Sequence, residues 1–118
     1  MVAMSQPSKW QVEFYTDLRG SNPVLEFVNG LANRERAKVF RVLKLLQEYG
    51  ILLAMPHALP LEKGLWELRA GAGRVFYFAH LDRRLILLHG YLKKSQQTPT
   101  KEIKTALRRM SEFKERHK

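Results

Sequence analysis

The feature that most constrains this 118-residue sequence is a series of three strand-like segments in its second half. Each segment is rich in aromatic and branched apolar side chains, which favour strands. The turns between them, Ala70-Gly71-Ala72-Gly73 and one containing Asp82-Arg83, are short enough to join only antiparallel neighbours. An antiparallel meander is therefore predicted. Its three strands are residues 65–69, 74–80 and 84–92.

Two further strand features complete the predicted sheet. The third meander segment is almost continuously apolar through Leu85-Ile86-Leu87-Leu88, which indicates a central strand covered on both faces. Near the N-terminus, residues 9–15 alternate, with Trp10, Val12 and Phe14 on one side. This period of two predicts one more strand before the meander.

Helical periodicity occurs in three places. Asn22-Pro23 is a typical helix start and opens a short amphipathic segment that ends near Leu31. Asn33 is a second cap candidate, before a helix over about 34–49 that Gly50 ends. Thr98-Pro99 starts a last helix by the same logic as Asn22-Pro23. Its apolar stripe comprises Ile103, Ala106, Leu107, Met110 and Phe113.

The predicted order is β-α-α-β-β-β-α, with residues 51–64 as a loop. The fold class is α+β: a twisted, mainly antiparallel sheet with an N-terminal helical hairpin on one face. The length favours one domain over residues 1–118, because a second core would be hard to accommodate.

The charge is large and uneven. The formal net charge is +10, yet residues 1–82 contain 10 basic and 8 acidic residues, against 11 and 3 in residues 83–118. A charge that only kept the protein soluble would have no reason to concentrate in one third of the chain. We therefore expect a polyanionic or acidic partner near the last strand, the loop after it and the last helix.

Several classes are excluded by composition. The chain has no cysteine, so disulfides, thiolate metal sites and a cysteine nucleophile are excluded. Its longest apolar run is Ile51–Met55, far shorter than a membrane span, and residues 1–10 lack the apolar core of a signal peptide. We expect a cytoplasmic protein with no membrane contact. The histidines form no short-spaced pair, so neither a metal site nor a small-molecule cofactor is predicted.

Four cations at strand ends are the candidate site. Arg69 and Arg74 flank the first turn of the meander, where antiparallel pairing places them side by side, and Lys93 and Lys94 end the third strand. Gathered together, they would hold a phosphodiester. The alternative is that the two arginines are hairpin-edge residues in surface ion pairs.

Such a site could also cleave RNA, which brings its own nucleophile, the 2′-hydroxyl. Without metal, cleavage needs a base, an acid for the leaving 5′-oxygen, and cations for the charge of the phosphorane. The basic side chains of the last helix could dock on RNA or face an acidic protein antagonist. Acid–base candidates are Lys93, Lys94, Glu67, His89 and Tyr91, and docking candidates are Lys101, Lys104 and Arg108.

Other side chains have simpler interpretations. The strand aromatics Trp66, Phe76, Tyr77 and Phe78 could stack on bases, but aromatics in strands are more often core. His80, at a strand end, is predicted at the surface. His89, in the apolar strand, is predicted to be a hydrogen-bonded core histidine.

Several motifs, in order, resemble the phage-derived toxin branch of the RelE/HigB group, over nearly the whole chain. They are Asn22-Pro23-Val24-x-Glu26-Phe27, Gly64-Leu65-Trp66-Glu67-Leu68-Arg69, Arg74-Val75-Phe76-Tyr77-Phe78, Leu87-Leu88-His89-Gly90-Tyr91-Leu92-Lys93-Lys94, and Thr98-Pro99 leading to Glu102-Ile103 and Ala106.

This resemblance implies a bacterial type II toxin with a microbial RNase-like fold. Members cleave mRNA in the ribosomal A site without metal and are held off by an antitoxin, in this branch a small helix-turn-helix protein. By position, Arg74 matches an arginine thought to contact the scissile phosphate, Lys93 and Lys94 match a basic pair after the last strand, and Arg69 matches a basic position before the turn. Glu67 stands where RelE-type toxins place a lysine.

Two points in the comparison stay open. The C-terminal tyrosine of some RelE toxins has no evident counterpart, and Tyr91 is the substitute to consider. ParE-type toxins share the fold but poison DNA gyrase, so fold alone does not separate the two activities. A member that only binds its partner protein is the third alternative.

Overall fold

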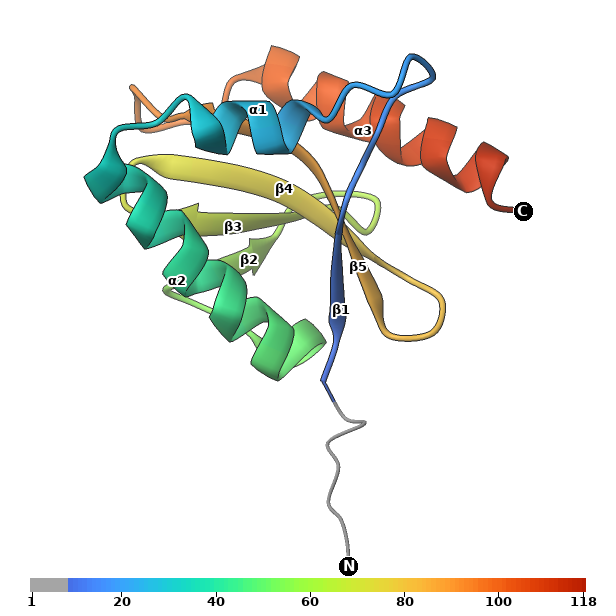
Figure 1. Ribbon diagram of the computed structural model, residues 1–118, viewed down its shortest axis with the longest axis horizontal. Helices are drawn as coiled ribbons and strands as arrows, with labels where there is room; N and C mark the ends of the chain where they lie inside the picture. The colour runs from blue at the N-terminus through green and yellow to red at the C-terminus, as the bar shows by residue number, and fades with distance from the viewer. Residues whose placement is uncertain (1–8) are drawn as a thin grey trace, which may run out of the picture.

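The computed structural model describes residues 9–118, so most of residues 1–10, which lack the apolar core of a signal peptide, lies outside the described residues. The described residues form a five-stranded sheet in the order β1-β5-β4-β3-β2 (Figure 1). β1 runs parallel to β5, and the other neighbours are antiparallel, as predicted for a mainly antiparallel sheet. The strands are β1 Gln11–Phe14, β2 Ala58–Pro60, β3 Trp66–Ala70, β4 Gly73–His80 and β5 Arg84–Leu92.

Helices cover both faces of the sheet. The hairpin of α1 (Pro23–Asn29) and α2 (Asn33–Tyr49) packs on one face, and α3 (Thr100–Arg116) packs on the other (Figure 1). Strand side chains alternate between the two cores, with Leu85 and Leu87 under the hairpin and Ile86 and Leu88 under α3. All four are fully buried, which confirms that this apolar run is an interior strand covered on both faces.

The helix starts agree with the sequence in one case and differ in two. The Asn22 side chain accepts a hydrogen bond from the backbone N–H of Leu25 (3.2 Å) and so caps α1 as predicted. At α2 the cap position is Ala32, because Asn33 is already helical and its side-chain oxygen accepts from Arg36. At α3 the cap position is Pro99, because the predicted cap, Thr98, donates its hydroxyl hydrogen bond elsewhere.

The segment predicted as a loop, residues 51–64, contains β2, a strand that the sequence did not predict. A 3₁₀ turn, Gly50–Leu52, follows α2, and β2 then pairs antiparallel with β3. Pro60 ends this edge strand, where its missing N–H removes no necessary ladder bond. The β3–β4 turn is also tighter than predicted, because β3 continues to Ala70 and β4 begins at Gly73.

Candidate functional site

The site is built at the end of the sheet where β3 and β4 turn. Arg69 of β3 is directly opposite Arg74 of β4, and Arg74 is directly opposite Tyr91 of β5. This confirms the prediction that the two arginines lie side by side. The three side chains form one row across three strands, on the face that α3 covers.

A buried glutamate lies behind this row. Glu67 is only 1% exposed, and its Oε2 is 3.0 Å from Nε of Arg74 and 3.7 Å from Nε of Arg69. Its other oxygen accepts a hydrogen bond from the Thr98 hydroxyl (3.2 Å). A buried carboxylate is tolerated only when cations and hydrogen-bond donors compensate its charge. Glu67 therefore holds both arginines and the β5–α3 loop next to one another.

Arg74 is held from both ends. Besides Glu67, its Nη1 donates to the turn carbonyls of Gly71 (2.7 Å) and Gly73 (3.0 Å). The alternative interpretation of the two arginines as ion-paired residues is therefore partly correct. They are ion-paired, but their partner is the buried Glu67 and not a carboxylate at the surface. The pairing orients the guanidinium and leaves the row with more positive than negative charge, because one carboxylate faces two cations.

Both lysines lie beside the oriented arginine. The backbone N–H of Lys93 donates to the carbonyl of Ala72 (2.8 Å), which holds the start of the β5–α3 loop against the β3–β4 turn. Arg74, Lys93 and Lys94 line one open pocket of about 590 Å³, which we call the phosphate pocket after the ligand predicted from the sequence. Of the four predicted cations, the structure thus brings three to one pocket, and Arg69 instead lines a separate one with Arg74.

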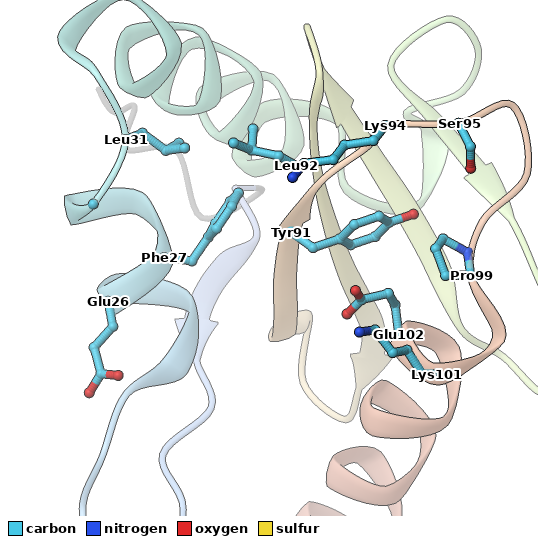
Figure 2. Close-up of a pocket in the computed structure, with 11 residues that line it drawn as sticks. Glu26, Phe27, Leu31, Tyr91, Leu92, Lys94, Ser95, Pro99, Lys101 and Glu102 are labelled. Carbon is cyan, nitrogen blue, oxygen red and sulfur yellow. The ribbon is translucent and has the colours of Figure 1, made fainter.

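A second pocket, of about 580 Å³, adjoins the phosphate pocket and shares Lys94 with it. Figure 2 shows Phe27 of α1 on one side and Tyr91 and Glu102 on the other. The Tyr91 hydroxyl is buried and, within residues 9–118, has no hydrogen-bond partner of good geometry. Burial raises the pKa of Tyr91, so this phenol stays protonated at neutral pH.

His89 is fully engaged in hydrogen bonds. Nη1 of Arg109 donates to its Nδ1 (3.1 Å), and because arginine can only donate, the neutral ring carries its proton on Nε2. That nitrogen lies 2.5 Å from the Glu102 carboxylate. Burial lowers the pKa of His89, partly offset by Glu102. The hydrogen-bonded histidine predicted from sequence is confirmed, and its role is to join α3 to β5.

The structure separates the acid–base candidates by access. Glu67 is buried behind its arginines, and both ring nitrogens of His89 are occupied. Tyr91, Lys93 and Lys94 line the two pockets, but the Tyr91 hydroxyl is itself buried. What the phosphate pocket offers most clearly is therefore positive charge, not a strong base.

The remaining predicted side chains have mixed outcomes. Lys101, Lys104 and Arg108 are exposed along α3, and Lys101 lines the pocket of Figure 2. The core interpretation of the strand aromatics is confirmed, with Trp66 only half-buried. The surface prediction for His80 is only partly right, since its ring packs edge-on against Phe113 of α3.

Sequence reasoning missed two basic residues. Lys38 and Arg41 of α2 line the same pocket as Arg69 and Arg74. Their spacing of three residues on one helix was the available signal, but nothing local relates α2 to a turn some thirty residues further along the chain.

Within residues 9–118, no group of three or more His, Asp or Glu side chains is arranged to hold a metal ion, and no helix is long and apolar enough to cross a membrane.

Comparison with known proteins places the chain in a family. The sequence model of the family described as "Phage derived protein Gp49-like (DUF891)" matches residues 26–111, well over half of the chain. The chain belongs to this family. A search of curated protein sequences gives no match to this Gp49-like protein.

A solved structure has the same fold as this Gp49-like chain. The crystal structure of the archaeal RelE–RelB complex from Pyrococcus horikoshii OT3 contains a chain that superposes with a TM-score of 0.57 at 17% sequence identity, covering 74% of this chain and 98% of that one. The family is phage-derived and the fold is RelE-like, as the resemblance stated from the sequence implied.

Proposed function

We propose that this protein is the toxin of a type II toxin–antitoxin pair and that it inhibits translation by cutting mRNA on the ribosome without a metal ion. The observation that carries the proposal is the convergence of Arg74, Lys93 and Lys94 on one open pocket, with Arg74 oriented by a buried carboxylate. The RelE-like fold and the Gp49-like family support it.

The chemistry follows from the charges of the pocket. The 2′-hydroxyl of RNA attacks the adjacent phosphorus and gives its proton to water. The bond to the 5′-oxygen then breaks and that oxygen takes up a proton, leaving a 2′,3′-cyclic phosphate and a 5′-hydroxyl. The extra negative charge of the phosphorane would lie against Arg74, Lys93 and Lys94, where preoriented cations contribute a few kcal/mol each. Lys93 and Lys94, the acid–base candidates that line the phosphate pocket, would donate the proton to the leaving oxygen, because the Tyr91 hydroxyl is buried.

Two partners follow from this proposal. The ribosome would present the mRNA, and the exposed Lys101, Lys104 and Arg108 of α3 would contact ribosomal RNA. A cognate helix-turn-helix antitoxin would block the toxin, since the excess of positive charge in residues 83–118 suits an acidic partner as well as RNA.

The experiment is a purified translation reaction in which protein synthesis and mRNA length are followed together. Wild type is expected to stop synthesis and shorten the mRNA, whereas the double variant Lys93→Ala/Lys94→Ala is expected to lose at least 100-fold in cleavage rate while remaining folded. Lys63→Ala, which changes no residue of the phosphate pocket or of the pocket beside it, is the matched control.

A gyrase supercoiling assay beside the translation reaction separates the other activities. Intact mRNA with trapped gyrase–DNA complexes would replace the proposal by a ParE-like gyrase poison. No effect in either assay, and no growth arrest on expression without antitoxin, would leave a non-catalytic partner-binding protein.

A further inference from the structure

Beside the phosphate pocket lies a second basic pocket, between α2 and the β3–β4 turn. Its volume is about 440 Å³, and four basic residues line it: Lys38 and Arg41 from α2, Arg69 from β3 and Arg74 from β4. Arg74 also lines the phosphate pocket, so one residue lies between the two pockets. We call the second one the α2 pocket.

The positive charge of the α2 pocket is only partly neutralised by ion pairs. Neither Lys38 nor Arg41 forms an ion pair with any residue in the part of the chain that the structure describes. The carboxylate that lies near the pocket's arginines is Glu67, which is buried and faces two cations. A cluster of cations that repel one another costs stability, so an anionic ligand is the simplest reason for it.

Lys38 is placed at the turn itself. A Cβ on Gly71, which has a φ of 63°, would lie 3.0 Å from Cδ of Lys38 and 3.4 Å from its Nζ. The lysine therefore extends along the glycine backbone, and its ammonium group lies at the rim between α2 and the turn. A side chain at residue 71 would push it away.

The lining of the α2 pocket is not purely basic. Val42, Leu45 and Pro56 contribute apolar surface, and His57 contributes an imidazole. A nucleotide has the matching composition, with an anionic phosphate and a ribose and base that pack on apolar or aromatic surface. An inorganic anion alone would make no use of the apolar part.

We infer that the α2 pocket is a second phosphate subsite for the same single-stranded RNA, next to the phosphate pocket and separated from it by Arg74. This inference rests on the proposed function and extends it, because it assigns RNA contacts to α2 as well as to the loop after β5. The RNA strand crosses the β3–β4 turn, and successive phosphates lie against Lys93 and Lys94 on one side and Lys38 and Arg41 on the other.

Binding to a single-stranded RNA whose riboses are 2′-O-methylated tests this, because such RNA lacks the free nucleophile. Fluorescence anisotropy is measured for wild type, Lys38→Ala/Arg41→Ala, and the control Lys44→Ala, which removes a charge from the same helix but outside the α2 pocket. The double variant is expected to bind at least tenfold more weakly. Its salt dependence should fall by about 1.4 in log–log slope, at about 0.7 per phosphate contact on a single strand.

The outcomes separate this inference from the proposed function. If Lys38→Ala/Arg41→Ala binds RNA like Lys44→Ala while Lys93→Ala/Lys94→Ala binds weakly, the α2 subsite is refuted and the phosphate pocket stands. If wild type binds no RNA, alone or on ribosomes, both fail. If the double variant loses affinity only for the antitoxin, the α2 pocket is a protein contact and the inference is overturned. Circular dichroism confirms that each variant is folded.

Discussion

The buried ion pair at the site makes the sharpest stability prediction. Glu67→Gln keeps the size of the side chain and an oxygen for the Thr98 hydroxyl, but it leaves Arg74 and Arg69 without their carboxylate. Removing one partner of a buried pair costs about 3–5 kcal/mol. Since the Arg74 and Arg69 side chains are 12% and 31% exposed, water compensates part of this, and we expect about 3 kcal/mol.

That cost is large for a domain of this size. It is a substantial fraction of the 5–15 kcal/mol by which native domains are stable, and at roughly 4 °C per kcal/mol it lowers Tm by about 12 °C. The control is Glu13→Gln. Its pairing with Arg84 is geometrically better, with one contact of 2.6 Å, but both side chains are a quarter to a third exposed, so we expect about 1 kcal/mol.

A double-mutant cycle isolates the interaction from the other effects of each substitution. Urea denaturation is measured for Glu67→Gln, Arg74→Gln and the double variant. The double variant should be less destabilised than the sum of the single variants, by about 2 kcal/mol, because each single change already breaks the same pair. Additive costs, or a cost for Glu67→Gln no larger than that for Glu13→Gln, would refute the claim that Glu67 anchors the arginines.

Two further changes test the packing around the site. Gly90→Ala would place a Cβ inside the Phe27 ring, so it should destabilise the protein by about 1–3 kcal/mol in urea denaturation, and no loss would show that α1 does not pack on β5 in this way. The lowered pKa of His89 means that the folded state binds a proton on this ring less readily than the unfolded state does. The resulting contribution to the free energy of unfolding is complete above pH 6.5 and is lost as the pH falls towards the pKa of His89 in the folded state. The Tm of the wild type should fall between pH 7 and 5. His89→Gln should make Tm depend less on pH, because it also removes the clash of a protonated Nδ1 with Arg109. Identical dependence of Tm on pH in the two proteins would contradict this.

Much of the fold follows from local patterns. The three meander segments carry dense strand signals, and Leu85–Leu88 is apolar enough to require cover on both faces. Most of the order of elements and the cover of the sheet on both faces are therefore predictable. β2 could not be predicted, because three residues ending in Pro60 are too short for periodicity and become a strand only by pairing with β3. The exact caps of α2 and α3 depend on which side chain finds a tertiary partner, as Thr98 does with Glu67.

The site is partly predictable for a similar reason. Arg69 and Arg74 flank a tight turn, so strand register alone places them side by side. Glu67 lies two residues before Arg69 and therefore faces the same side of the sheet. Its burial makes it an ion-pair partner of Arg74 on the next strand rather than a base, and burial is not visible in the sequence. Lys38 joins the site only because α2 packs over the β3–β4 turn, a tertiary relation that no sequence spacing shows.

The central claim is that the RNA supplies its own nucleophile, the 2′-hydroxyl, and the most direct test is to remove that hydroxyl at the position of cleavage. Cleavage positions are mapped on an mRNA in the translation reaction, and the mRNA is then remade with a single 2′-deoxyribose on the 5′ side of the main cut. Because the phosphate pocket supplies cations and the RNA supplies the nucleophile, cleavage there is expected to disappear, and the original RNA should carry a 2′,3′-cyclic phosphate at that end. Persistent cutting at the deoxy position would contradict the account.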